Sequence, residues 1–237
     1  MNNTTLAVQH VSFGYDNHSA VLNDITFHAE AGESIGLVGA NGVGKSTLLK
    51  LLVGLHLPTS GSIQLDDWAV EPKNLPQIRE KIGYVFQDSD SQLFMSTAYE
   101  DIAFAPRNYG LSKKEVDARV NHALDAIDIQ YLRDKQIYKM SGGEKKLVSI
   151  ATILSMTPDV ILMDEPSMGL SPIFVNEIFD IIQEVSKSGT TVLLVEQNIG
   201  KSWIGTAALS AKNNKIRRNF VNKRISLCYD KNIKRAL

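Results

Sequence analysis

The sequence predicts an α/β fold in which a mostly parallel sheet is flanked by helices, with an antiparallel β-subdomain and an α-helical subdomain beside this core. Two apolar runs, at residues 35–38 and 160–163, have the length and composition of central strands that are covered on both faces. Each run ends at glycine or polar residues, and ligands of parallel sheets lie at such strand ends. The length of 237 residues and the apolar content of 43% suit one compact core with a subdomain.

The first apolar run leads into a glycine-rich loop at residues 39–47, with the sequence Gly-Ala-Asn-Gly-Val-Gly-Lys-Ser-Thr. The loop matches the phosphate-binding pattern Gly-x-x-x-x-Gly-Lys-Ser/Thr, and a helix-favouring run at residues 48–52 follows it. Its glycines can turn backbone N–H groups toward an anion, while Lys45 adds a charge for the phosphates and Ser46 a hydroxyl for Mg²⁺. We therefore expect a nucleoside triphosphate site formed by Gly39, Asn41, Gly42, Gly44, Lys45, Ser46 and Thr47.

The second apolar run ends in two acids, Asp164 and Glu165, about 120 residues after the loop. A central strand would carry both side chains to the carboxyl edge of the sheet. There Asp164 would hold Mg²⁺ through water, and Glu165 would orient and deprotonate the attacking water. An acidic pair after a strand is more often an ordinary exposed turn, but its place after a phosphate-binding loop favours the catalytic interpretation.

A third pattern, Met-Ser-Gly-Gly-Glu-Lys-Lys at residues 140–146, lies about 20 residues before the acids. Ser141 can cap a helix that begins there, and the glycines leave backbone N–H groups unshielded. One chain cannot easily bring this second anion site onto its own loop. With the three patterns in this order, the chain resembles the nucleotide-binding subunits of ABC transporters, in which two cassettes face each other head to tail. The resemblance implies a homo- or heterodimer with a second ATP-binding subunit, whose ATP is covered by Ser141, Gly142, Gly143 and Glu144.

This resemblance covers residues 5 to about 198 and implies a P-loop NTPase core of the ABC type that binds ATP and Mg²⁺. Tyr15 matches the aromatic residue that stacks on adenine in the family. Gln87 matches the glutamine that reaches the metal and the attacking water, so the implied metal ligands are Ser46, Gln87 and Asp164. Apolar residues at positions 6, 8, 11 and 13 and the stretch 61–65 resemble the antiparallel β-subdomain of that fold.

Two capping boxes, Thr97 with Glu100 and Ser112 with Glu115, each open a helical segment. An apolar stripe follows the second box and predicts core packing, at Val116, Val120, Leu124 and Ile127. We therefore expect a helical subdomain over about residues 88–155, the part that meets the transmembrane transporter subunits in the family. The stretches 86–94 and 100–112 resemble the energy-coupling factor branch, the ATPases of cobalt, nickel and vitamin importers.

The last third is similar to a different branch. Residues 167–172, Ser-Met-Gly-Leu-Ser-Pro, and the Glu-Gln-Asn that ends residues 191–198 resemble branched-chain amino acid importer ATPases. Gln197 stands where most ABC ATPases have a histidine that senses the γ-phosphate, and we expect it to act with Glu165 in catalysis. Glutamine can donate a hydrogen bond there but cannot become cationic. Two alternatives stay open: a branched-chain amino acid importer ATPase, and a truncated relic impaired in hydrolysis.

Residues 1–200 thus form the expected ABC ATP-binding domain, and residues 201–237 a basic tail. The tail holds ten Lys or Arg against one acid, Asp230, and neither the further strand nor the C-terminal helical region of the family is visible in it. The basic residues are scattered and have no aromatic platform, so we expect no nucleic-acid partner. We interpret the tail as irregular or aberrant sequence.

The rest of the composition bears on location. No apolar stretch approaches the roughly 18–20 residues that span a bilayer. The N-terminus has no basic segment followed by an apolar one, so we expect no signal peptide. A single cysteine, Cys228, suits a reducing compartment. We expect a peripheral protein on the cytoplasmic face of the cell membrane, attached through its transmembrane partner.

Overall fold

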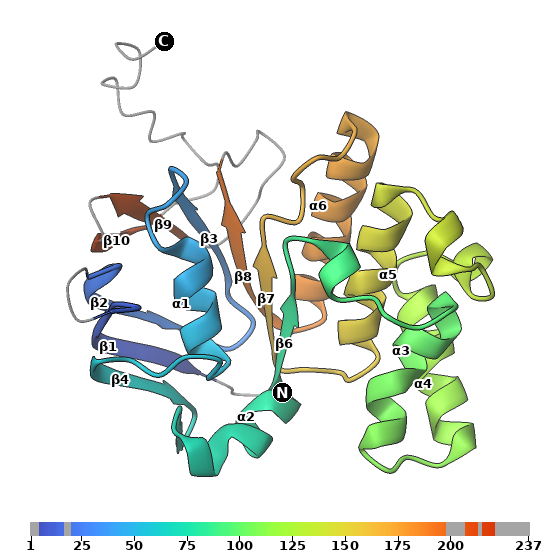
Figure 1. The fold of residues 1–237 in the computed structure, drawn as a ribbon, viewed down its shortest axis with the longest axis horizontal. Coiled ribbons are helices and arrows are strands. Elements are labelled where there is room, and N and C mark those ends of the chain that lie inside the picture. The colour runs from blue at the N-terminus through green and yellow to red at the C-terminus, as the bar shows by residue number, and fades with distance from the viewer. Residues whose placement is uncertain (1–4, 17–19, 198–206, 213–214, 221–237) are drawn as a thin grey trace.

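The structure, a computed structural model, describes residues 5–16, 20–197, 207–212 and 215–220. Two sheets form one side of the molecule in the view of Figure 1, and a group of helices forms the other. The helix α1 (Lys45–Leu52) and the helix α5 (Gly142–Leu154) lie on opposite sides of the strands of the larger sheet (Figure 1). This arrangement decides which of the sequence patterns can meet within one chain.

The larger sheet has the strand order β10-β9-β3-β8-β7-β6, and its neighbouring strands are parallel except for the pair β10 and β9. Every residue of β7 and β8 is buried, as expected for central strands that are covered on both faces. The predicted parallel α/β core is therefore confirmed. The strands are β3 (Ser34–Gly39), β6 (Ile82–Val85), β7 (Val160–Asp164), β8 (Thr191–Glu196), β9 (Ala207–Lys212) and β10 (Lys215–Phe220).

The smaller sheet is antiparallel, in the order β2-β1-β4-β5, which confirms the predicted β-subdomain. The apolar residues of β1 are buried, and their spacing breaks from two to three between Val8 and Val11 because the pairing register with β2 shifts there. The sequence patterns did not single out β2 or β5. The strands are β1 (Leu6–Phe13), β2 (Leu22–Ala29), β4 (Ser60–Leu65) and β5 (Trp68–Ala69).

The remaining helices lie mostly on the face of the larger sheet that is opposite α1. Both predicted capping boxes are present, at the starts of α3 and α4. All four residues of the predicted apolar stripe are buried. Among the described residues, no helix is long and apolar enough to cross a membrane. The helices are α2 (Leu75–Lys81), α3 (Ala98–Asn108), α4 (Lys113–Asp125) and α6 (Pro172–Lys187), with short 3₁₀ turns η1 (Pro72–Asn74), η2 (Ser89–Ser91), η3 (Gln130–Leu132) and η4 (Ile137–Lys139).

Two hydrophobic cores lie on the two faces of the larger sheet, because successive strand residues point to opposite sides. In β7, Val160 and Leu162 join a core with α1 and the smaller sheet, whereas Ile161 and Met163 join a core with α3 to α6. The residues of β8 divide in the same way. The strand ends are therefore fixed from both sides, and this holds the polar residues that follow them in place.

The tail differs in part from the prediction. Residues 207–212 and 215–220, expected to be irregular, form β9 and β10, and β9 pairs in parallel with β3. The physical reason is that the second edge of β3 carries backbone N–H and C=O groups that need partners, and a nearby extended segment can supply them whatever its side chains. The other tail residues, 201–206, 213–214 and 221–237, lie outside the described residues.

Candidate functional site

The phosphate loop, residues 39–47, connects the end of β3 to the start of α1. Gly42 and Gly44 have φ angles of 79° and 92°, a backbone conformation that favours glycine. A Cβ on Gly44 would also come within 2.7 Å of the Leu22 side chain, so a side chain is excluded there by space as well. These turns leave the first N–H groups of α1 directed at the loop, which is the geometry of an anion site.

The Lys45 side chain folds back across the phosphate loop. Its Nζ donates hydrogen bonds to the carbonyl oxygens of Gly39, at 2.8 Å, and Ala40, at 3.0 Å. The same Nζ lies 3.3 Å from Oε1 of Glu165, and the two side chains are only 4% and 7% exposed. The loop thus encloses a positive charge whose counter-ion is the acid at the end of β7.

Asp164 accepts hydrogen bonds at both carboxylate oxygens. Oδ1 accepts one from the Ser46 hydroxyl and Oδ2 one from the Tyr84 hydroxyl, each at 2.9 Å. Burial raises the pKa of the Asp164 carboxyl, and these hydrogen bonds partly offset the shift. Burial, followed by the charge of Asp164, raises the pKa of the Tyr84 hydroxyl, which therefore stays a neutral donor.

Ser46 and Asp164 are suited to a hard metal ion because a hydroxyl and a carboxylate oxygen lie side by side. Mg²⁺ usually takes one or two protein oxygens and completes its shell with water and substrate phosphates. The described residues contain no group of three or more His, Cys, Asp or Glu side chains that could hold a metal. As two neighbouring oxygen donors, Ser46 and Asp164 fit Mg²⁺ that is bound jointly with a phosphate.

Glu165 begins a turn directly after β7 with a φ of 42°, an uncommon value for a residue with a side chain. Its N–H donates to the Val195 carbonyl at 2.9 Å, so the turn is tied to β8. Its Oε2 accepts a hydrogen bond from Nε2 of Gln197 at 2.9 Å, and Nε2 of Gln87 lies 3.5 Å from the same oxygen. The Glu165 carboxylate is thus surrounded by three predicted site residues from separate segments: Lys45, Gln87 and Gln197.

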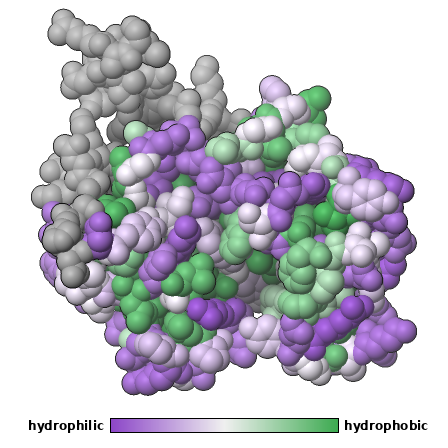
Figure 2. Space-filling view, viewed as in Figure 1, coloured by the Kyte–Doolittle hydropathy of each residue, from purple (hydrophilic) through white to green (hydrophobic). Residues whose placement is uncertain are grey.

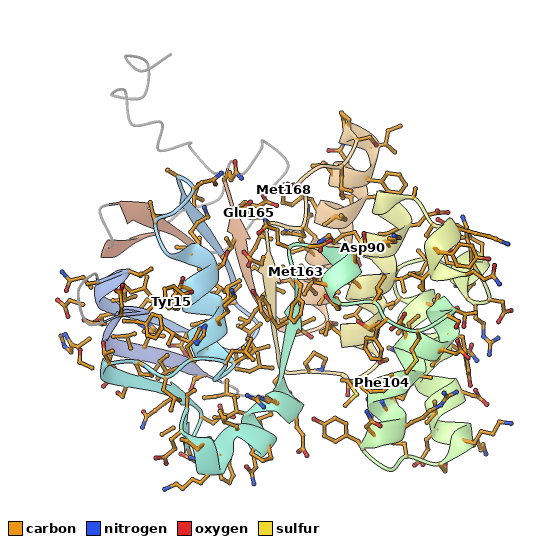
Figure 3. All side chains as sticks on the ribbon, in the orientation of Figure 1. Tyr15, Asp90, Phe104, Met163, Glu165 and Met168 are labelled. Atoms are coloured by element: carbon orange, nitrogen blue, oxygen red, sulfur yellow. The ribbon has the colours of Figure 1, made fainter. Side chains whose placement is uncertain are left out.

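Gln87 is not brought to the other two predicted metal ligands. Within the described residues, its side-chain amide donates to Glu165, at 3.5 Å, and to Sδ of Met168, at 2.9 Å, rather than to Ser46 or Asp164. Figure 3 shows Glu165 and Met168 near each other at the carboxyl end of β7. Of the three predicted metal ligands, Ser46 and Asp164 are therefore hydrogen-bonded to each other. The Gln87 side chain contacts Glu165, the next residue after Asp164, instead.

Tyr15 lies at the other end of the phosphate loop, over the β-subdomain (Figure 3). Its hydroxyl shares a hydrogen bond with the Thr47 hydroxyl at 3.1 Å. Its ring meets the rings of Phe13 and His56 edge-on, at centroid distances of 5.1 and 5.4 Å, yet the residue is 59% exposed. The fold therefore places an aromatic ring beside the loop that packs against two other rings and still has one side open to solvent.

The signature segment, residues 141–144, forms the start of α5. Ser141 and Glu144 cap each other reciprocally, and Nζ of Lys135 lies 2.7 Å from Oε1 of Glu144. That bond, followed by the Ser141 N–H, lowers the pKa of the Glu144 carboxyl. A Cβ on Gly143 would come within 2.5 Å of the Phe174 ring, whereas Gly142 is exposed, and a Cβ there would meet only the Leu170 side chain, at 4.0 Å.

Within the described chain, no recorded hydrogen bond joins the signature segment to the phosphate loop. Figure 1 shows why, because the larger sheet separates α1 from α5. Asn41, also predicted to bind ATP, is exposed on the phosphate loop. The two anion-binding patterns of the sequence thus form two separate surfaces of one chain.

Sequence reasoning missed three polar residues around the site, two of them buried and one, Tyr84, partly buried. Tyr84 was not singled out, although it binds Asp164. Glu196, 3% exposed, accepts the Ser167 N–H at 3.0 Å, and burial raises its pKa. Lys146, 2% exposed, belongs to the third pattern, but no role of its own was predicted for it. A signal existed for Lys146, because it occupies the apolar face of α5 with Ile150 one turn later.

Lys146 contacts the chain just before η2. Its Nζ donates to the carbonyl oxygens of Phe86, at 2.8 Å, and Gln87, at 2.7 Å. Burial lowers the pKa of the Lys146 ammonium to about 8, although the charges of Asp88, Asp164 and Glu196 act in the opposite direction. A costly buried charge is therefore held by backbone carbonyls beside the site.

Comparison with known proteins agrees with this geometry. Residues 22–168, more than half of the chain, match the ABC transporter family. An ABC transporter ATP-binding protein of Geobacter sulfurreducens is 43% identical over 184 residues, 78% of this chain and 74% of that protein. The energy-coupling factor transporter ATP-binding protein EcfA of Methanococcus maripaludis is 37% identical over 196 residues, 82% of this chain and 70% of that protein.

A solved structure gives the same result for the fold. CbiO1 from Clostridium perfringens, described as part of the ABC transporter complex CbiONQ, superposes with a TM-score of 0.85. It is 33% identical, and the alignment covers 92% of this chain and 89% of that one. The resemblance inferred from the three patterns is therefore confirmed: the chain belongs to the ABC transporter family and is an ATPase subunit of it.

Proposed function

We propose that this ATPase subunit energises the import of a metal ion (cobalt or nickel) or a vitamin through separate transmembrane subunits. The observation that carries the proposal is the contact of the Glu165 carboxylate with Lys45 and Gln197, which joins a phosphate site to a general base. The importer class is supported by the likeness to EcfA and CbiO1, and by residues 86–94 and 100–112 of the sequence.

The proposed chemistry begins with the phosphates of ATP on the N–H groups of the phosphate loop. Lys45 then turns from Glu165 to the β- and γ-phosphates, and the freed Glu165 oxygen accepts a proton from the attacking water. Gln197, already at the carboxylate, donates its amide N–H to the γ-phosphate. Tyr15 stacks on adenine, supported by Phe13 and His56.

Mg²⁺ would be held by Ser46 and Asp164, with Gln87 as the third ligand that the family resemblance implies. The bound ion would neutralise charge on the phosphates. In this proposal Tyr84 orients the Asp164 carboxylate toward the shared site, because it already holds the second oxygen.

The signature segment is proposed to close over ATP held by a second ATP-binding subunit. Three features support this: the N-terminus of the 13-residue helix α5, the open face at Gly142 and the separation from the chain's own loop. Homodimer and heterodimer both satisfy this geometry. ATP binding would close the dimer, and hydrolysis with product release would reopen it.

The transmembrane partner is proposed to bind a groove of about 420 Å³ between β6, α3 and α5. Figure 2 shows a hydrophobic area over the part of the surface where Figure 3 labels Phe104. Phe94, 64% exposed, meets the Phe104 ring edge-on at 4.8 Å, so the two rings present apolar surface together. The lining includes Tyr84, Phe86, Phe94, Phe104, Tyr109 and Ile153. Attachment there would hold the subunit on the cytoplasmic face of the membrane.

Co-expression tests the assignment. The full chain should co-purify with an energy-coupling-type transmembrane subunit and not with a branched-chain amino acid permease pair. Phe94→Ser should weaken that complex, whereas Tyr131→Ser, which changes a ring that is 67% exposed outside the groove, should not. Recovery with the permease pair instead would move the substrate class to amino acids, the alternative that residues 167–172 and 191–198 favour.

A further inference from the structure

Lys146 is a buried polar group beside the site that the proposed chemistry does not use. It lies on the buried face of α5, two residues after the signature segment, and is 2% exposed. A buried ammonium costs folding free energy that an apolar residue of similar size avoids. Here the ammonium donates two short hydrogen bonds to consecutive carbonyl oxygens, those of Phe86 and Gln87.

Helix α5 makes further contacts with residues 86–92, which we call the Gln87 segment. Nζ of Lys145 lies 2.5 Å from Oδ1 of Asp90. Nε2 of Gln92 donates to the Ser149 carbonyl at 2.8 Å, while its Oε1 accepts the Phe86 N–H at 2.9 Å. The segment is thus fastened along two turns of α5, and the helix and the segment should move as one body.

The two ends of this body reach the two functional surfaces. One end is the signature segment, proposed to contact the ATP of a second subunit. The other is the Gln87 amide, which contacts Met168 and lies 3.5 Å from the Glu165 carboxylate. Lys146 binds the backbone of Gln87 itself, so no flexible link lies between the helix and that residue.

We propose that Lys146 is a positioning residue that couples the start of α5 to Gln87. A nucleotide bound by the second subunit at the signature segment would then set the place of Gln87 in this subunit's own site. The inference rests on the proposed roles of Gln87 and of the signature segment. It predicts that Lys146 affects catalysis only through Gln87, whereas a residue that merely fills the core would affect both sites independently.

A double-mutant cycle tests this on the purified full chain, by measuring kcat and KM for ATP hydrolysis. Lys146→Met should lower kcat about ten- to hundredfold, the usual cost of removing an outer-shell partner, with little change in KM. In a Gln87→Ala background the same substitution should cause no further loss. Lys187→Met is the matched control, because it removes a lysine from the surface of α6, where the ion pair with the 65% exposed Glu184 contributes little.

Rescue gives a second readout. Lys146→Arg, which keeps charged donors, should retain more activity than Lys146→Met, and the melting temperatures of all variants separate unfolding from lost coupling. If Lys146→Met does not fold, the cycle is run with Lys146→Gln, which keeps one donor group and a similar length.

Independent losses that multiply in the double variant would overturn the coupling, as would a Lys146→Met enzyme with unchanged kcat. Both results leave the proposed function intact. A Gln87→Ala enzyme with wild-type kcat would instead remove the proposed role of Gln87, and the role of Lys146 with it. The two failures are therefore distinguishable from the four kcat values.

Discussion

Lys45 and Glu165 form a buried ion pair, with Nζ 3.3 Å from Oε1. The cation proposed to hold the phosphates and the carboxylate proposed to be the base are therefore each other's partners. A triphosphate on the loop competes with Glu165 for the same ammonium. Because Gln197 holds the other carboxylate oxygen, loss of Lys45 frees one oxygen of Glu165 without freeing the whole side chain. In the proposed mechanism, phosphate binding and release of the base are therefore one event.

Glu165→Gln is the first test of this relationship. The amide cannot take a proton from water, so kcat should fall by on the order of a hundredfold or more. ATP affinity should be kept or increased, because no carboxylate competes with the phosphates for Lys45. The variant should accumulate as an ATP-bound dimer, measurable by size-exclusion chromatography with nucleotide analysis. Lys45→Ala is the contrasting control and should weaken ATP binding itself. Unchanged turnover in Glu165→Gln would refute the mechanism.

Gln197 can be tested by two substitutions at one position. Gln197→Ala removes the amide that contacts Glu165 and should lower kcat. Gln197→His restores a ring donor that can also carry charge, so kcat should stay the same or rise. Steady-state rates at saturating ATP decide between these outcomes. If the alanine variant hydrolyses ATP at the wild-type rate, Gln197 does not contact the reacting phosphate.

Tyr15 should contribute to binding rather than to the chemical step. Loss of one aromatic stacking partner corresponds to about 0.5–1.5 kcal/mol, so Tyr15→Ala should raise KM for ATP roughly two- to tenfold with kcat unchanged. Tyr15→Phe keeps the ring and loses only the hydrogen bond to Thr47, and it should resemble the wild type. A phenylalanine variant as impaired as the alanine variant would assign the effect to the hydroxyl instead.

Much of this arrangement follows from local sequence patterns. The phosphate loop, the buried strand before Asp164 and the capped starts of α3 and α4 each depend on a few adjacent residues, and all are present in the structure. The phosphate loop and Asp164 meet at one edge of the parallel sheet, because the carboxyl ends of parallel strands share that edge. The contact between Glu165 and Gln197 is a consequence of β7 and β8 being neighbours.

The contacts that the sequence did not predict depend on tertiary packing. Nothing adjacent to Tyr84 indicates that its hydroxyl reaches Asp164, 80 residues away. The position of Lys146 on the apolar face of α5 indicates burial, but its bond to the Gln87 carbonyl follows only from the packing of α5 against the Gln87 segment. The pairing of β9 with β3 depends on backbone groups, which no residue pattern reports. Long-range polar contacts and the pairing of strands at a sheet edge could therefore not be predicted from the sequence.

Asp101 gives a prediction about stability and pH. It is 4% exposed, and its carboxylate accepts the N–H groups of Phe94 and Met95, each at a shortest distance of 3.2 Å. Burial raises the Asp101 pKa above its ordinary value of 3.8, and these hydrogen bonds only partly offset the shift. The folded protein therefore binds a proton at a pH where the unfolded chain does not.

The sign of the effect follows from that difference in bound protons. In the range between 3.8 and the raised pKa of Asp101, the contribution of Asp101 to the free energy of unfolding increases as the pH falls. Asp101→Asn cannot titrate at this position, whereas every other group titrates in both proteins. The melting temperature of the wild type relative to Asp101→Asn should therefore rise as the pH is lowered from 7 toward 4. A difference in melting temperature that stays constant or falls would mean that burial does not disfavour the Asp101 carboxylate. The hydrogen bonds from the Phe94 and Met95 N–H groups would then outweigh the free-energy cost of removing the carboxylate from water.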